Sequence, residues 1–422
     1  MNIGGERRVN ICLSKNKKRG VGRHRKRSLS REIGCFLSKK GLVKPANKVG
    51  LDCQRKRTAS GTGLLLQALF SFMFLVGSIY ATKSSPIPKT VLEKFRINRF
   101  HPKTTFYRAI SKLDFQSLEA FNDTLLKTAV NLQEKIIVTL DTTALEVWSK
   151  NYADACWGGC SKGTFFGYKL FAAILHGKDV VIQHWLAPAN FNELDLAFQQ
   201  VIMLLRKLPR IDVLLIDRGY FSFEFFAFLI QKNIGFVTVA RDDTAAVNTY
   251  LKETTGIVFH QLSETCWYHE TLLWFPALRR NLRAVFVRKE IGEEQPREYV
   301  ILSNLGSEYS AIQLIKLYPQ RQGREDVFDR LKNELNLHKP CKIKNLAGIQ
   351  AAVALTITAY NIYTLFSHET IGTYTTVTVM HRLFLFDEIE KALAKRETET
   401  ITEEAISKTE RYKQDSQHST LS

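Results

Sequence analysis

Four polar residues near position 320 have types and spacing that suit phosphate chemistry: Tyr318, Arg321, Glu325 and Lys332. On an α-helix with 100° per residue, their offsets place all four side chains within about 60° of one another, on one stripe. A carboxylate flanked by two cations and a phenol suits a site that holds a divalent metal ion and a phosphate together. The alternative is a solvent-facing surface with an Arg321–Glu325 ion pair at i, i+4, which leaves the alignment of Tyr318 and Lys332 unexplained.

Two aspartates upstream each close a short β-branched run. Asp141 ends the run 136–141, and Asp217 follows the run 211–216. Both runs predict buried strands, and sites in open α/β sheets form where the carboxyl ends of such strands meet. Taken alone, either acid has the ordinary alternative of a turn or cap residue.

Together with Glu325, these two aspartates predict a cluster of three carboxylates. Three bare anions at close range raise one another's pKa and repel, so such a cluster needs cations. Mg²⁺ or Mn²⁺ ions prefer oxygen ligands, and a pair of them can clamp the attacking and leaving oxygens of a phosphoryl transfer. The sequence therefore predicts a site for two divalent ions at Asp141, Asp217 and Glu325.

The elements that must position these residues alternate between strands and helices. From residue 136 to 240 the expected order is β, β, β, α, β, α, β, which makes an α/β fold with a mixed five-stranded sheet. The predicted strands are 136–141, 165–175, 180–186, 211–216 and 234–240, and the predicted helices are 193–208, with Asn192 as its cap, and 221–231.

Changes in composition divide the chain into segments. Short runs rich in Val, Phe, Trp and Tyr at 257–260, 267–275, 284–288 and 299–302 predict a β-rich insertion. We expect a basic, disordered arm (1–60), a helical N-terminal region (61–132), a first part of the catalytic core (133–242), the β-rich insertion (243–310), a second part of the core with the acid-bearing helix (311–366) and a charged tail (367–422).

The net charge of +19 indicates a polyanionic partner, but the charge is concentrated at one end. Residues 1–57 hold 18 Lys and Arg against 3 Asp and Glu. DNA binding by the rest of the chain must therefore be argued from local sites. The stretch 63–81 is uncharged over 19 residues, so both a buried helix and a membrane span remain open for it, and the polar residues within it favour the buried helix.

The seven cysteines are scattered and odd in number. Cys156 and Cys160 form a C-x3-C pair without a second pair at zinc spacing, so reduced thiols are expected rather than a zinc site.

At this point the residues resemble a known family. The order Asp141, Asp217, Glu325, the Asp-Arg-Gly-Tyr context of the second aspartate and the Tyr-x2-Arg-x3-Glu-x6-Lys spacing are similar to the DDE transposases of bacterial insertion sequences, in the branch called insertion sequence family four. The resemblance covers roughly residues 135–366. It implies an RNase H-like catalytic domain that carries a β-rich insertion before the last acid.

The same resemblance implies a reaction and its partners. The three acids would bind Mg²⁺ or Mn²⁺, and Tyr318, Arg321 and Lys332 would hold phosphates at the transposon end. One strand is cut at the terminal inverted repeat, the freed 3′-hydroxyl forms a hairpin, and the opened end is joined to target DNA. The implied assembly is a homodimer that bridges two ends, in the cytoplasm and associated with the nucleoid.

A tryptophan of the insertion stacks on a flipped base in relatives, which makes Trp267 and Trp274 candidates for that role, with a place in the sheet core as the alternative. Two other functions remain open. One is a catalytically silent or domesticated, transposase-derived DNA-binding protein. The other is a membrane-anchored protein, which rests on the stretch 63–81 alone.

Overall fold

The computed structural model describes residues 36, 38–41, 115–130, 134–147, 149–160, 163–290, 296–335, 337 and 345–371. The apolar stretch 63–81, the tail beyond residue 371 and most of the predicted basic arm lie outside the described residues. Of the arm, residues 36 and 38–41 are described, and the buried Phe36 packs edge-on against Phe366, with ring centroids 5.5 Å apart. The helix α6 (Phe115–Leu126) belongs to the predicted helical N-terminal region.

A mixed sheet runs through the described part of the chain, and ten strands belong to it. The first half is β1 (Ile137–Glu146), β2 (Cys156–Cys160), β3 (Gly163–Leu175), β4 (Val180–Pro188), β5 (Val213–Ile216) and β6 (Gly235–Val239). β3 runs antiparallel to β1, and β4 runs antiparallel to β3. β5 pairs parallel with the other edge of β1, and β6 pairs parallel with β5, which gives the order β4-β3-β1-β5-β6. The predicted α/β fold with a mixed sheet is confirmed, and this strand order fits an RNase H-like core.

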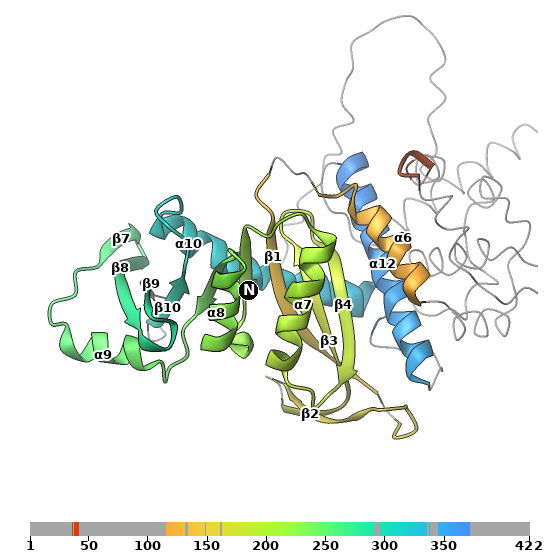
Figure 1. The fold of residues 1–422 in the computed structure, drawn as a ribbon, viewed down its shortest axis with the longest axis horizontal. Coiled ribbons are helices and arrows are strands. Elements are labelled where there is room, and N and C mark those ends of the chain that lie inside the picture. The colour runs from red at the N-terminus through yellow and green to blue at the C-terminus, as the bar shows by residue number, and fades with distance from the viewer. Residues whose placement is uncertain are drawn as a thin grey trace, which may run out of the picture.

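The second half of the sheet comes from the predicted β-rich insertion: β7 (His260–Ser263), β8 (Cys266–Phe275), β9 (Arg280–Lys289) and β10 (Arg297–Ser303), with α9 (Ala245–Glu253) before them and the short 3₁₀ turn η3 (Pro276–Leu278) between β8 and β9. Because β10 pairs with β6, these strands continue the core sheet instead of forming a separate one. Figure 1 shows this group at one end of the molecule and α6 with α12 (Leu346–Ile371) at the other.

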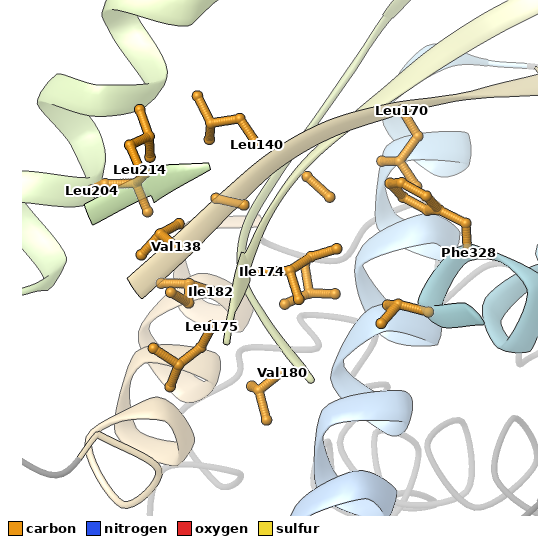
Figure 2. Packing of buried hydrophobic residues seen from close by; sticks show 14 of the residues in the cluster. Val138, Leu140, Leu170, Ile174, Leu175, Val180, Ile182, Leu204, Leu214 and Phe328 are labelled. Atoms are coloured by element: carbon orange, nitrogen blue, oxygen red, sulfur yellow. The ribbon is translucent and has the colours of Figure 1, made fainter. Parts of the chain in front are cut away.

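Helices cover both faces of the sheet. On one face, α7 (Glu193–Lys207) and α8 (Phe223–Gln231) bury apolar side chains against alternate residues of β1, β5 and β6. On the other, α10 (Ala311–Leu317) packs on Val213, Val237 and Val285. Figure 2 shows Val138 and Leu140 of β1 beside Leu204 of α7 on one side of the strands.

Several local features match their sequence signals. The side chain of Asn192 accepts a hydrogen bond from the Leu194 amide, which caps α7 where the sequence predicts a cap. The turn between β3 and β4, which falls between the predicted strands 165–175 and 180–186, has Gly177 at φ 77° and Asp179 at φ 54°, a left-handed backbone that glycine and aspartate tolerate. The sequence did not predict α9 or β2. The strand expected at 257–260 begins only at His260, as β7.

Two predictions about the site elements are wrong. β1 does not end at Asp141 but continues to Glu146, because its other edge pairs with β3 as far as Gly167. The segment with the polar stripe is not one uniform α-helix: a 3₁₀ stretch η4 (Tyr318–Arg324) follows α10, then come α11 (Glu325–Asp329) and a π-helical turn η5 (Arg330–Glu334). Pro319 has no N–H to donate to the preceding turn, so the α-helical pattern cannot run through it.

Within the described residues, α12 is the one helix long and apolar enough to cross a membrane, over Leu346–Glu369. Its most apolar window is 94% buried inside the protein, as in the core helix of a globular domain.

Candidate active site

Asp141 and Asp217 lie side by side at the edge of two neighbouring parallel strands. The register pairs Leu140 of β1 with Ile216 of β5, so each aspartate is the next residue along its own chain. Asp217 leaves the sheet there and precedes the 3₁₀ turn η2 (Arg218–Tyr220). Both aspartates contact Arg321, so the structure brings together the two acids that the sequence predicts to meet.

Arg321 of η4 bridges the two aspartates. Its Nη1 lies 3.8 Å from Asp141 Oδ2, and its Nη2 lies 3.4 Å from Asp217 Oδ1. The guanidinium is nearly buried, with its side chain 11% exposed, and its Nε has no hydrogen-bond partner among the described residues. Burial alone would lower the pKa of Arg321, but Asp217, Tyr318 and Asp141 raise it above its usual value. Arg321 therefore stays a cation and holds the two carboxylates together.

Tyr318 shares the face of η4 that carries Arg321. A 3₁₀ helix has three residues per turn, so side chains at i and i+3 eclipse one another. The guanidinium carbon of Arg321 accordingly lies 5.7 Å from the centre of the buried Tyr318 ring. Burial raises the pKa of the Tyr318 phenol, and the Arg321 charge opposes the rise, so the phenol is neutral near pH 7.

The charge on Asp141 is set by competing effects. Burial raises the pKa of its carboxyl from 3.8 to about 6, while Arg321 and the Thr142 amide, which donates to Asp141 Oδ1 at 2.8 Å, act in the opposite direction. Asp217 and then Glu193 add smaller increases. Although Arg321 is close, desolvation outweighs the ion pair because the carboxyl is almost out of water.

The Asp-Arg-Gly-Tyr turn is tied back to β1. The hydroxyl of Tyr220 lies 2.9 Å from Thr142 Oγ1, and the tyrosine is fully buried. This hydrogen bond fixes the turn that follows Asp217 next to the strand that carries Asp141. Tyr220 was part of the predicted motif, but the pattern gave no sign that Thr142 is its partner.

Glu193 of α7 is a further carboxylate near this edge, and sequence reasoning assigned it no role in the site. It pairs with Lys169 of β3 at 3.7 Å. Burial raises its pKa, Lys169 opposes the rise, and Asp217 adds to it. Its only sequence signal is an acid directly after the Asn192 cap, which an ordinary helix start also has.

The other two predicted residues lie farther along the helical segment. Glu325 opens α11 directly after η4, and its side chain lies outside the described part of the structure. Lys332 is half-buried on η5, where the neighbouring Arg330 pairs with Asp179 at 3.6 Å and with Asp326 at 3.9 Å. The alignment of all four side chains that a uniform α-helix would give does not apply to this segment, because its pitch changes twice.

The two candidate tryptophans differ in their surroundings. Trp274 of β8 is 56% exposed, so a place in the sheet core is wrong for it, whereas Trp267 is half-buried. Neither has a described contact with Asp141, Asp217 or Arg321.

Asp141 and Asp217 have the chemistry that a divalent cation requires. Both offer hard oxygen ligands, and one cationic guanidinium offsets only part of their combined negative charge. In the described part of the chain, no three Asp, Glu, His or Cys side chains lie close enough to hold a metal ion by themselves. The predicted third acid, Glu325, is among the side chains outside that part.

Residues 132–362, more than half of the chain, match the model of the transposase DDE domain family. The chain belongs to this family. The matched part of the DDE domain contains all six predicted site residues, and the family expected from the sequence is confirmed. Among solved structures, the chain is similar to a piggyBac transposase in a synaptic complex with hairpin DNA, studied by cryo-electron microscopy. The identity is 14%, the TM-score is 0.46, and the match covers 84% of this chain and 80% of that one. No curated protein matches.

Proposed function

We propose that this DDE transposase cuts and joins DNA at an active site formed by Asp141, Asp217 and Glu325. The observation that supports this most is the pair of aspartates on adjacent parallel strands with one buried arginine between them. A purely structural ion pair would need one carboxylate. Two carboxylates around one guanidinium leave a net negative charge at the sheet edge, where a divalent cation would be attracted.

Mg²⁺ or Mn²⁺ would be held by Asp141 and Asp217, with Glu325 as the third acid. Two such ions supply Lewis-acid stabilisation of the attacking and leaving oxygens in phosphoryl transfer. The role of the protein is to fix its oxygen ligands through strand register and to keep Asp141 in a nearly dry environment, where its electrostatic interactions are strong.

Tyr318, Arg321 and Lys332 would contact phosphates of the DNA. In the structure the Arg321 guanidinium pairs with both aspartates and offsets part of their charge. Once cations take over that role, its two terminal nitrogens can donate to a phosphate in the bidentate manner typical of arginine. Tyr318 restricts where the guanidinium can move, because its buried ring lies next to the guanidinium, 5.7 Å from ring centre to guanidinium carbon.

The substrate we propose is the terminal inverted repeat of the element that encodes this chain, with target DNA as the second substrate. Cut-and-paste transposition requires two ends in one assembly, so we expect a homodimer on DNA and an association with the nucleoid. The insertion sequence family four branch is part of this proposal.

The test is strand cleavage of a duplex that carries the element's own terminal repeat, with Mg²⁺. Asp217→Asn and Glu325→Gln keep the shape of each side chain but remove its charge, and we expect each to lower cleavage by about 10³-fold or more while DNA binding by gel shift is retained. Glu224→Gln is the matched control, because Glu224 lies fully exposed on α8 and should have no effect. Full activity of either site variant would contradict the assignment, and a wild-type protein that binds the repeat without cutting it would support a silent, DNA-binding descendant.

A further inference from the structure

Arg330 links the helical segment of the candidate site to the turn between β3 and β4. It is the first residue of η5, and its side chain is only 20% exposed. Its Nη1 lies 3.6 Å from Asp179 Oδ2, and its Nη2 lies 3.9 Å from Asp326 Oδ2. Asp326 is on the same helical segment, four residues earlier, whereas Asp179 belongs to the turn between the two strands. The pair with Asp179 is therefore a contact between separate elements of the fold.

The turn that carries Asp179 is held firmly to the core. Asp179 has a left-handed backbone, and its N–H donates to the Leu175 carbonyl at 3.1 Å. The strands on either side of the turn are paired from Leu175 and Val180 onward. Val181 exchanges two hydrogen bonds with the buried side chain of Asn361 on α12, at 2.9 and 2.8 Å. The Asp179 carboxylate is thus a fixed point of the core sheet.

Apolar side chains attach the helical segment to the same core. Val327 and Leu331 are fully buried, and Phe328 is nearly so. Figure 2 shows Phe328 pointing from α11 toward Leu170 of β3. Burial of apolar surface stabilises this contact but has no preferred direction, so it restrains sliding and rotation of the segment only weakly. The ion pair between Arg330 and Asp179 adds a contact that does depend on direction and position.

A simpler explanation for Arg330 would be an ordinary i, i+4 ion pair on a helix surface, which stabilises a helix only slightly. That explanation fits Asp326, whose side chain is 67% exposed. It does not account for the burial of Arg330 or for its approach to Asp179.

The helix type at Arg330 is also unusual. The Leu335 amide donates to the Arg330 carbonyl at 3.0 Å, which is the i to i+5 pattern of a π turn. Such turns are rare and frequently occur at functional sites. This one contains Lys332 and directly follows α11, which begins at Glu325. Arg330 is therefore located between two of the predicted site residues.

We propose that Arg330 is a positioning residue for strand cleavage, which acts through its pair with Asp179. The pair fixes the place on the core sheet at which α11 presents Glu325 and η5 presents Lys332. This inference rests on the proposed function, in which Glu325 works together with the two aspartates of that sheet. Because a misplacement of about 1 Å can lower a reaction rate on the order of 10²-fold, loss of this pair should affect cleavage more than DNA binding.

The test is single-turnover cleavage of the terminal-repeat duplex by saturating full-length protein with Mg²⁺, together with DNA affinity by gel shift. We expect Arg330→Gln and Asp179→Asn each to lower the cleavage rate on the order of 10²-fold and to leave the DNA affinity unchanged. Asparagine tolerates the left-handed backbone at position 179, so the turn itself should persist. The double variant should be no slower than the slower single variant, because both substitutions break the same pair. Arg330→Lys keeps the charge and should recover part of the rate.

Asp326→Asn is the matched control, since it removes a charge beside the same guanidinium but leaves the pair between the elements intact. We expect it to cut at the wild-type rate, and circular dichroism at the assay temperature checks that every variant is folded.

Three outcomes would overturn the role of Arg330 while Glu325→Gln still abolishes cleavage and the proposed function stands. Arg330→Gln could cut at the wild-type rate, the double variant could lose the product of the two single losses, or the loss of rate could only parallel a loss of folded protein. A wild-type protein that binds the repeat without cutting it would overturn both proposals.

Discussion

The sheet edge with Asp141 and Asp217 and the helical segment from Tyr318 to Glu334 position their functional side chains in different ways. In the sheet, hydrogen-bond register places the two aspartates one step beyond a paired Leu140 and Ile216, and any slip would turn them to the other face. In the helical segment, each change of pitch rotates every later side chain, since a 3₁₀ turn has three residues and an α turn 3.6. Strand register therefore fixes a site more reliably than spacing along a helix does.

The largest change in stability is expected from a substitution in the hydrophobic core beneath the two aspartates. Leu214 is fully buried in β5 and lies next to Val138 of β1, with Leu204 nearby (Figure 2). We expect Leu214→Ala to lower the free energy of unfolding by about 2–5 kcal/mol, because it leaves a cavity between α7 and the sheet. Denaturant unfolding measures this.

The control for that variant is Ile202→Ala on the exposed side of α7, which should change the free energy of unfolding by less than about 0.5 kcal/mol. A similarly small change for Leu214→Ala would mean that the sheet does not hold its functional side chains more firmly than the helical segment does.

A second prediction concerns the charge of Asp141, the aspartate on β1 of the sheet. Because the pKa of Asp141 is about 6 in the folded protein and 3.8 ordinarily, the folded state holds a proton between these pH values that the unfolded state has released. The free energy of unfolding of the metal-free protein should therefore fall as pH rises from about 4 to about 6, by on the order of 3 kcal/mol from this group, and then level off. Asp141→Asn should remove this contribution.

Arg321→Gln sharpens the same experiment, because Arg321 lowers the pKa of Asp141. Without the guanidinium the fall in stability should extend to higher pH. The measurement is chemical unfolding with a chelator at a series of pH values. A pH profile of Asp141→Asn that coincides with that of wild type would show that the carboxyl titrates normally.

The smallest effect on stability is expected from a substitution of Pro319, which tests the helical segment. Pro319→Ala restores an N–H that can extend α10, which should change the pitch ahead of Arg321 and lower strand cleavage. The free energy of unfolding should change by less than about 1 kcal/mol. Pro209→Ala, in the exposed link between α7 and β5, has the same effect on the unfolded chain and should leave cleavage unchanged. Equal cleavage by both variants would show that pitch at η4 does not matter.

The sequence was sufficient to predict where the two aspartates lie along their strands, because a short β-branched run that ends on an acid is a local pattern. It was not sufficient for the length of β1, which depends on pairing with β3 more than twenty residues later. The straight stripe failed because Pro319 changes the helix type locally. The place of Glu193 near the η2 turn could not be predicted, because it comes from the packing of α7 against η2, and no spacing in the chain encodes that packing.

The pairing of β10 with β6 has a consequence for synthesis of the chain. When β6 leaves the ribosome, its partner β10 is still about sixty residues from being made, since β6 ends at Val239 and β10 begins at Arg297. During that interval the nascent sheet has an open edge of unpaired amide and carbonyl groups next to buried valines, which favours association with other chains. Messenger RNAs truncated between the codons for these two strands should therefore yield insoluble fragments. A messenger RNA that extends past the codon for Ser303 should yield a chain in which β10 closes the edge.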